Sequence, residues 1–173
     1  VISNSAYSTT LFAPPNMSVP NADYMAGMYA STLIKDGGTL QIGIGSLGDA
    51  IVYACKVRQD DNAGYQALLK DLDIDESLLS EYGGSGQFEQ GLYGSSEMFV
   101  NGFMHLIKSG IVKRKVYDDL ELQTMLNEGR ISEQINTDTI TMLIEDGVIN
   151  QQLSHSDFIF LQHWGIFNDQ VQW

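Results

Sequence analysis

The 173-residue sequence is poor in cysteine, and this shortage excludes one class of protein. Cys55 is the single cysteine, so no disulfide can form within the chain, and a disulfide-stabilised secreted scaffold is excluded. Cys55 lies in an apolar run with no His or Cys at metal-ligand spacing, which predicts a core residue. We therefore expect a reducing, cytoplasmic setting.

Basic residues and long apolar runs are also scarce. Nine Lys and Arg stand against 22 Asp and Glu, which gives a formal net charge of −13. A surface of this sign repels phosphate backbones and anionic lipid headgroups. No apolar run reaches the roughly 18 residues of a membrane-spanning helix, and the first residues lack the features of a signal peptide. We expect neither nucleic acid nor a membrane as a partner.

The few prolines are confined to the beginning of the chain. All three lie in the first 20 residues, which predicts an extended linker over 1–20. The apolar spacing that follows predicts a helix that Asn21 caps and Gly37 or Gly38 ends. A short strand over 39–42 is expected next.

That strand runs directly into a glycine-rich segment, 43–48, and helical spacing resumes from Ile51 to Val57. A strand, a glycine turn and a helix in this order are typical of an open α/β sheet whose ligand edge lies at the turn. Glycines there let backbone N–H groups approach a bound group, and the helix N-terminus favours an oxyanion. Plain packing of the turn explains the same pattern.

The rest of the chain predicts mostly helices. Residues 59–87 are expected to form an acidic insertion of one or two amphipathic helices and a flexible glycine loop. A second strand is expected over 90–94, followed by a helix from Met98 that Gly110 closes. Residues 117–173 predict three helices, the last capped by Ser154, and no repeat period is apparent.

Glu97 is the second chemical candidate after the glycine-rich segment. It falls at the start of the predicted helix, whose cap is expected to be Ser96, and the helix dipole there favours an ionised, nucleophilic carboxylate. The ordinary preference for acidic residues in first helical turns explains the position equally well. The three histidines do not form a ligand set, so no metal is assigned. The basic run 113–115 is interpreted as a solvated loop.

Two motifs resemble one known family. Residues 36–45 (DGGTLQIGIG), followed by 48–51 (GDAI), are similar to a glycine-rich stretch of the acetyl-CoA hydrolase/transferase family, which includes 4-hydroxybutyrate CoA-transferase. Residues 95–102 (SSEMFVNG), with 109–112 (SGIV), resemble its glutamate-containing stretch, and the family glutamate falls on Glu97. The resemblance covers about residues 36 to 57 and 91 to 116. Ser46, Gly48 and Ser95 depart from the family's usual glycine, proline and histidine, which bears on loop shape and acyl preference.

The resemblance implies an α/β fold, namely part of an open, mostly parallel-sheet CoA-transferase-like domain with inserted helical segments. Its core would comprise 21–58 and 88–116, with helical insertions at 59–87 and 117–173. The chain also starts without an initiator methionine. We therefore expect part of the C-terminal half of a two-domain enzyme, inactive as an isolated fragment.

The resemblance also implies a reaction. Glu97 would attack an acyl-CoA thioester, and coenzyme A would pass through a glutamyl-CoA thioester to a carboxylate or be released by water. The oxyanion and acyl-CoA loop would comprise Gly43, Ile44, Gly45, Ser46, Leu47 and Gly48, with Gln41 and Asn101 as further candidates. The partners would be acyl-CoA and a small carboxylic acid, with no permanently bound cofactor, and a homodimer is compatible with this interpretation. Alternatives are a fragment that binds coenzyme A or a partner chain without turnover, and a sugar-phosphate isomerase-like relative.

Overall fold

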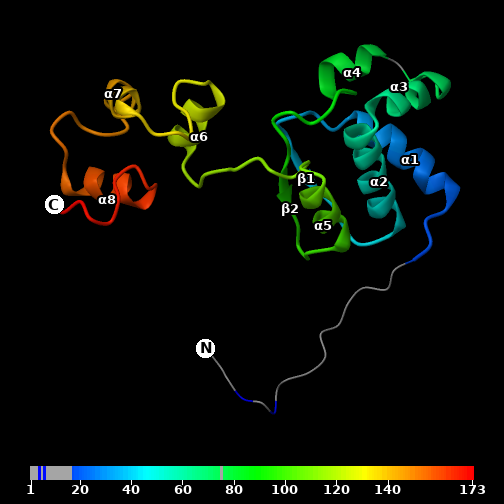
Figure 1. Ribbon diagram of the computed structural model, residues 1–173, viewed down its shortest axis with the longest axis horizontal. Coiled ribbons are helices and arrows are strands. Elements are labelled where there is room, and N and C mark those ends of the chain that lie inside the picture. The colour runs from blue at the N-terminus through cyan, green and yellow to red at the C-terminus, as the bar shows by residue number, and fades with distance from the viewer. Residues whose placement is uncertain (1–3, 5, 7–16, 75) are drawn as a thin grey trace. The chain divides into compact units, whose positions relative to one another are not determined.

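The computed structural model describes residues 4, 6, 17–74 and 76–173 (Figure 1). The chain divides into two compact units, Val1–Lys115 and Val116–Trp173. Most of the predicted linker, 1–20, lies outside the described residues. In the described ranges, no helix has the length and apolarity that crossing a membrane requires. The fold is mixed and helix-rich with a small parallel sheet, which agrees with the coarse α/β class.

The sheet of the first unit contains two short parallel strands. β1 (Thr39–Gln41) pairs with β2 (Tyr93–Ser95), and Gln41 stands opposite Ser95. β1 agrees with the prediction, whereas β2 begins three residues after the predicted start at residue 90. The reason is local, because Gly91 has a φ of 83° and the N–H groups of residues 89–91 bond to a side chain instead of a strand.

That side chain is Asp36, in the turn before β1. Its carboxylate accepts hydrogen bonds from the N–H groups of Gly37, Glu89, Gln90 and Gly91 at 2.8 to 3.0 Å. Asp36 thus joins the segments that precede the two strands, so it aligns their starts.

We predict that Asp36→Ala lowers the free energy of unfolding by about 1–3 kcal/mol, because four N–H groups lose one shared acceptor. Asp36→Asn keeps one carbonyl oxygen and is expected to lose less. Urea unfolding followed by circular dichroism measures both. Asp60→Ala removes an exposed carboxylate that pairs with Lys56 at the surface, and is expected to cost under about 1 kcal/mol. Equal losses for Asp36→Ala and Asp60→Ala would contradict the alignment role.

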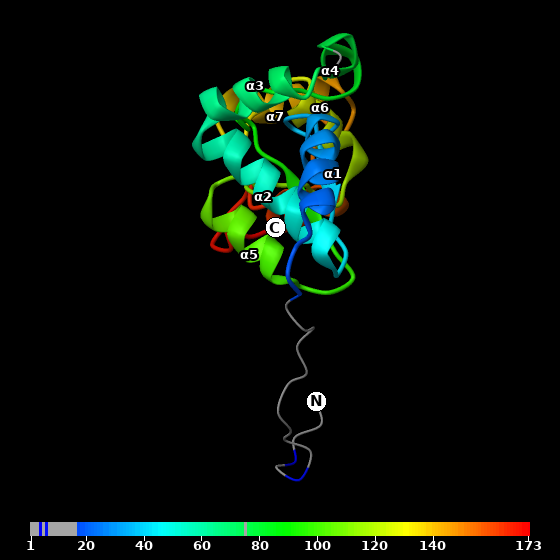
Figure 2. The same ribbon diagram turned by 90° about the vertical axis from the view of Figure 1, so that its right-hand side faces the viewer.

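Two helices of the first unit lie side by side, α1 (Asn21–Thr32) and α2 (Ser46–Asp60) (Figure 2). They approach closely at Gly27, where an added Cβ would lie 2.8 Å from the carbonyl carbon of Ala50. Two predicted boundaries of the first helix are wrong. Pro20, and not Asn21, is the N-cap residue, and the helix ends at Thr32 instead of at Gly37 or Gly38.

The early end of α1 has a tertiary cause. The guanidinium of Arg58, on α2, donates to the carbonyls of Ser31 and Ile34 at 3.1 and 2.7 Å. These carbonyls lie where the helix stops, and a buried cation favours the negative end of a helix dipole. An α2 side chain therefore caps the C-terminus of α1.

The predicted acidic insertion is helical, with α3 (Asn62–Asp71) and α4 (Glu76–Tyr82). Its apolar residues belong to a buried cluster shared with α1 and α2, which contains Met28, Ala54, Tyr65, Leu69 and Leu79. The loop after α4 was expected to be flexible, but the structure anchors it. Gly84 donates to the Thr32 carbonyl, and the Ser85 carbonyl accepts from Asn62 and Gln66.

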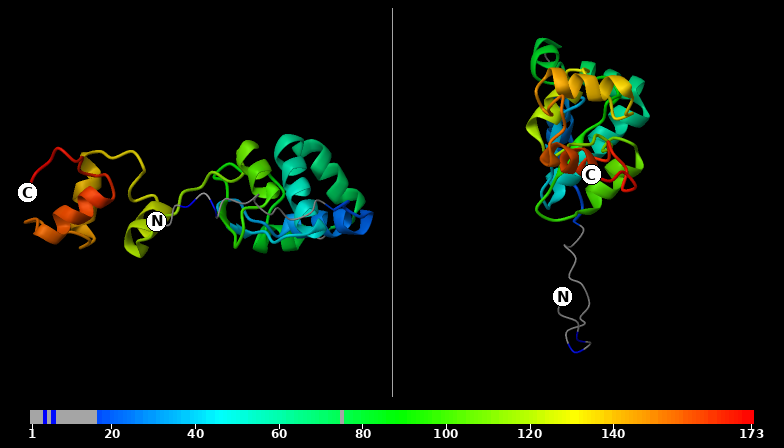
Figure 3. Two further views of the ribbon diagram at one scale, coloured as in Figure 1. Left: turned by 90° about the horizontal axis from the view of Figure 1, so that it is seen from below. Right: turned by 90° about the vertical axis from the view of Figure 1, so that its left-hand side faces the viewer.

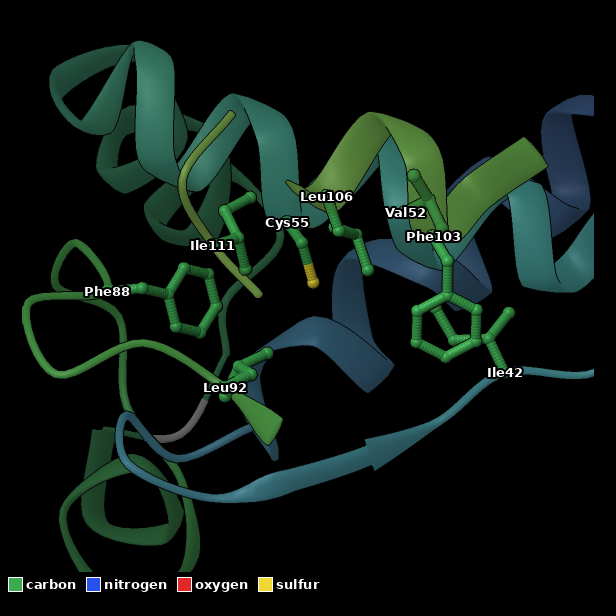
Figure 4. Packing of buried hydrophobic residues seen from close by; sticks show 8 residues of the cluster. All are labelled: Ile42, Val52, Cys55, Phe88, Leu92, Phe103, Leu106 and Ile111. Carbon is green, nitrogen blue, oxygen red and sulfur yellow. The ribbon is translucent and has the colours of Figure 1, made fainter. Parts of the chain in front are cut away.

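A second buried cluster connects the sheet with α2 and with α5 (Asn101–Lys108). Figure 4 shows its members, which are Ile42, Val52, Cys55, Phe88, Leu92, Phe103, Leu106 and Ile111. Cys55 is fully buried here, which confirms its predicted place in the core. Burial raises the pKa of Cys55 to about 12, so the thiol is protonated at neutral pH and cannot serve as a nucleophile.

The second unit contains three helices, as the sequence predicts: α6 (Leu120–Asn127), α7 (Thr137–Glu145) and α8 (His155–His163) (Figure 3). Ser154 caps α8, which confirms that expectation. The helices share a buried cluster of Leu122, Met125, Ile131, Leu143, Ile149 and Leu161. This unit therefore has an apolar core of its own.

α5 and the three helices of the second unit share one repeated type of helix ending, so the expectation of no repeat period is wrong. Two residues after the end of each of these helices comes a glycine with positive φ, namely Gly110, Gly129, Gly147 and Gly165, at steps of 19, 18 and 18 residues. After each glycine, the next two N–H groups bond to one carbonyl, that of Leu106, Met125, Leu143 or Leu161. These four residues are at most 1% exposed. The period is hard to see in the sequence, because the residues around the four glycines are alike in polarity but differ in type.

Asp157 gives the second unit a testable dependence on pH. Hydrogen bonds from the Asn150 side chain and from Ser154 hold the pKa of Asp157 well below its ordinary value, at about 2. A carboxyl group whose pKa is lower in the folded state stabilises the fold above its unfolded pKa, near pH 4, and loses this effect as the pH falls toward 2.

We predict that Asp157→Asn is less stable than the parent chain at pH 5 to 7, and that the difference shrinks as the pH falls from about 4 to about 2. Thermal unfolding of α8 at a series of pH values, followed by circular dichroism, measures the difference. A stability difference that stays constant over this pH range would show that the charge of Asp157 does not contribute to the stability of the fold.

Candidate active site

The two predicted site segments meet at one edge of the sheet. Parallel pairing with Gln41 opposite Ser95 places the carboxyl ends of β1 and β2 together. The glycine-rich segment leaves β1 there, and Glu97 follows β2. The Ser96 hydroxyl donates to the Met98 carbonyl and lies 3.5 Å from the carbonyl oxygen of Ile42. The sequence predicted this neighbourhood for Glu97 and the glycine loop.

The loop in the glycine-rich segment is shorter than predicted. α2 begins at Ser46, so Ser46, Leu47 and Gly48 form its first turn. Gly45 has a φ of 128°, a conformation that favours glycine, and it is the N-cap residue. A Cβ added to Gly43 or Gly45 would meet no atom within 4 Å, so open space adjoins both.

Gly48 has a different role from the two glycines before it. A Cβ there would lie 2.7 Å from the carbonyl oxygen of Gly43 and 3.1 Å from Ile42. Gly48 therefore allows α2 to pack closely on the end of β1, which is a structural task. Gly43 and Gly45 are the positions at which a bound group can approach the backbone.

The N-terminus of α2 carries positive potential. No side chain caps it, and the first N–H groups of a helix have no partner inside that helix. The helix dipole adds positive potential at this end. Asp49, an exposed residue of the same turn, opposes part of that potential.

Glu97 does not lie in the first turn of a helix, so this part of the prediction is wrong. It is exposed, in a bend between β2 and α5, and α5 begins at Asn101 with Val100 as its N-cap residue. Ser96 does not cap α5, because α5 begins five residues later, at Asn101, and its N-cap residue is Val100. Glu97 is therefore a loop residue at a strand end, where catalytic groups are often found.

The two further candidates also lie close to this edge in the chain. Gln41 is the last residue of β1 and is exposed. Asn101 is the first residue of α5, four positions after Glu97, and is exposed as well. The structure thus leaves both side chains accessible next to segments that carry the site.

The surroundings of the edge are apolar. Four large, exposed apolar residues adjoin it in the chain, namely Ile44, Leu47, Met98 and Phe99. A groove of about 270 Å³ is lined by Gly94, Ser96, Phe99, Phe103, Ile107 and Val112. Ser96 and Phe99 flank the bend that contains Glu97. A larger cavity of about 750 Å³, between α3, α4 and the loop 83–86, contains none of the predicted site residues.

The three histidines are divided between the two units. His105 is exposed on α5, while His155 and His163 belong to the second unit. In the part of the chain that the structure describes, no group of three acidic, His or Cys side chains is placed to hold a metal ion. The N–H of Lys113 bonds to Leu92 at the amino end of β2, whereas Glu97 follows the carboxyl end.

One contact at the site was not predicted. The Ser46 hydroxyl donates to the carboxylate of Asp23, in the first turn of α1, at 2.5 Å. No sequence signal identified Asp23, because an acidic residue in a first turn is ordinary and the partners are 23 residues apart.

Comparisons of the chain with models of protein families, with curated proteins and with solved structures give no match. The assignment of this site therefore depends on the two motifs and on the geometry of the sheet edge.

Proposed function

We propose that this chain carries the nucleophile of an enzyme that moves coenzyme A from an acyl-CoA to a carboxylate or to water. One observation carries the proposal, the parallel register of β1 and β2 that brings Glu97 and the glycine segment to the same sheet edge. In open α/β sheets, ligands bind at the carboxyl ends of strands. The two units would belong to a CoA-transferase-like domain and its helical insertion.

The reaction begins with the Glu97 carboxylate. One of its oxygens attacks the thioester carbonyl, the C–S bond breaks, and coenzyme A leaves as a thiolate, which gives an acyl–glutamyl anhydride. The thiolate then attacks the Glu97 carbonyl of the anhydride and releases the first acid as a carboxylate. The resulting glutamyl-CoA thioester reacts with a second carboxylate, which completes a transfer, or with water, which completes a hydrolysis.

Each attack passes through a tetrahedral oxyanion, which needs hydrogen-bond donors. The N–H groups at Gly45 and at the start of α2 are suited to this role, because no side chain caps this helix end and open space adjoins the glycines. One such donor contributes on the order of 3 kcal/mol in other enzymes. The coenzyme A thioester would be a substrate, the second substrate a small carboxylic acid, and the setting cytoplasmic.

Trapping the covalent intermediate tests the proposal. The natural protein that carries this sequence is incubated with acetyl-CoA and no acceptor, then treated with borohydride, which reduces a glutamyl-CoA thioester to an alcohol. Peptide mass spectrometry is expected to find the reduced side chain at Glu97. Turnover of acetyl-CoA without any modification at Glu97 would contradict the mechanism, and turnover of phosphorylated sugars alone would favour an isomerase.

A further inference from the structure

We propose that Asp23 is a positioning residue that fixes the glycine segment of the site through the hydroxyl of Ser46. The inference rests on the proposed function, because it concerns the donors that would bind the oxyanion. It assigns a role to a residue outside both sequence motifs.

The contact joins two helix starts. Asp23 is in the first turn of α1, and Ser46 is the first residue of α2, directly after Gly45. The hydroxyl donates to a carboxylate oxygen at 2.5 Å, and both side chains are half-buried. Because Ser46 is bonded to Asp23, its hydroxyl holds the turn from the side and leaves the N–H groups of α2 available to a ligand.

The glycine segment is packed against α2 on one side and open on another. A Cβ on Gly48 would lie 2.7 Å from the Gly43 carbonyl oxygen, whereas Cβ atoms on Gly43 and Gly45 would meet no described atom within 4 Å. Among the described residues, no side chain caps α2. On the open side the Asp23–Ser46 hydrogen bond anchors the backbone immediately next to Gly45, so that its N–H groups keep one direction.

Asp23 is itself on a firmly seated helix. α1 packs against the backbone of α2 at Gly27, where an added Cβ would lie 2.8 Å from the carbonyl carbon of Ala50. Asp23 and Gly27 are four residues apart on α1, and their partners on α2, Ser46 and Ala50, are also four residues apart. The carboxylate of Asp23 therefore has a fixed position from which to hold Ser46.

Loss of this anchor is expected to affect the chemical step more than substrate binding. An oxyanion forms only as the thioester is attacked, so misdirected donors lower kcat and leave KM nearly unchanged. Displacement of a catalytic group by about 1 Å costs on the order of a hundredfold. We expect Asp23→Ala to lower kcat by about ten- to a hundredfold, with KM within about threefold.

The experiment measures acetyl-CoA turnover in the natural protein and in five variants: Asp23→Ala, Asp23→Asn, Ser46→Gly, the double variant of Asp23→Ala with Ser46→Gly, and Tyr24→Leu. Asp23→Asn keeps an acceptor oxygen and is expected to recover much of the kcat. The double variant is expected to be no slower than Ser46→Gly, since Asp23 acts only through Ser46. Tyr24→Leu removes the edge-to-face contact of Tyr24, on α1, with the ring of Tyr53, on α2. It is the matched control, and its kcat is expected to be nearly unchanged.

The outcomes separate this inference from the proposed function. If acetyl-CoA is not turned over, or if turnover does not depend on Glu97, the proposed function fails and the positioning role fails with it. If turnover depends on Glu97, three results would overturn the positioning role alone: kcat within twofold after Asp23→Ala, an equal loss in Tyr24→Leu, or additive losses in the double variant. If Asp23→Ala does not fold, the kcat of Asp23→Asn is compared with that of Ser46→Gly. The positioning role predicts a lower kcat for Ser46→Gly, and equal kcat values would overturn it.

Discussion

Glu97→Gln is expected to abolish nearly all acyl-CoA turnover in the natural protein, by about a thousandfold or more in kcat. An amide has almost the shape of the carboxylate but is a poor nucleophile. The substitution is expected to change the free energy of unfolding by less than about 1 kcal/mol, because Glu97 is exposed in a bend. Steady-state kinetics and urea unfolding of the same preparations measure the two effects.

Two further variants sharpen this test. Glu97→Asp keeps the charge but shortens the side chain by one methylene, and is expected to lose on the order of a hundredfold. Glu89→Gln removes another exposed carboxylate of the first unit, and is expected to retain full activity. Normal turnover in well-folded Glu97→Gln protein would eliminate the covalent mechanism.

The second large effect concerns the stability of the first unit. Arg58 is 1% exposed, and its guanidinium donates to the carbonyls of Ser31, Ile34 and Gly86. It also lies over the Phe88 ring, 4.2 Å from the centroid. Burial lowers the pKa of Arg58, since the charged form loses its hydration. These contacts connect α1, α2 and the loop before β2 at one point.

We predict that Arg58→Met lowers the free energy of unfolding by about 3–5 kcal/mol, because three carbonyls lose their donor while the side-chain volume is largely kept. Arg58→Lys keeps a charge but not the planar fork, and is expected to lose about half as much. Lys56→Met, two residues earlier on the same helix and half-buried, is the control and is expected to cost under about 1 kcal/mol. Urea unfolding that finds Arg58→Met within 1 kcal/mol of the parent chain would contradict this role.

Element types were predicted well, and element boundaries less so. The apolar spacing in 117–173 and the cap at Ser154 predicted α6 to α8, since local periodicity and capping chemistry decide where such helices form. The ends of α1, β2 and α5 were misplaced. For α1 and β2 a distant group holds the chain: Arg58 bonds to carbonyls at the end of α1, and Asp36 accepts hydrogen bonds from the N–H groups before β2.

For the candidate site, the order of the motifs predicted which residues would be neighbours, because two parallel strands place their carboxyl ends together. It did not predict that Glu97 lies in a bend or that Asp23 contacts Ser46. Neither fact has a local signature, since both follow from how α1, α2 and β2 pack.

The sequence by itself determined the presence of the helices and the two strands and the order of the two motifs, because these depend on residues close together in the chain. Only the tertiary structure decided the register of β1 against β2, the buried place of Arg58 and the support of the glycine segment by Asp23. These features depend on groups 23 to 55 residues apart, and their contacts form only when packed helices and strands bring backbone carbonyls, N–H groups and side chains together.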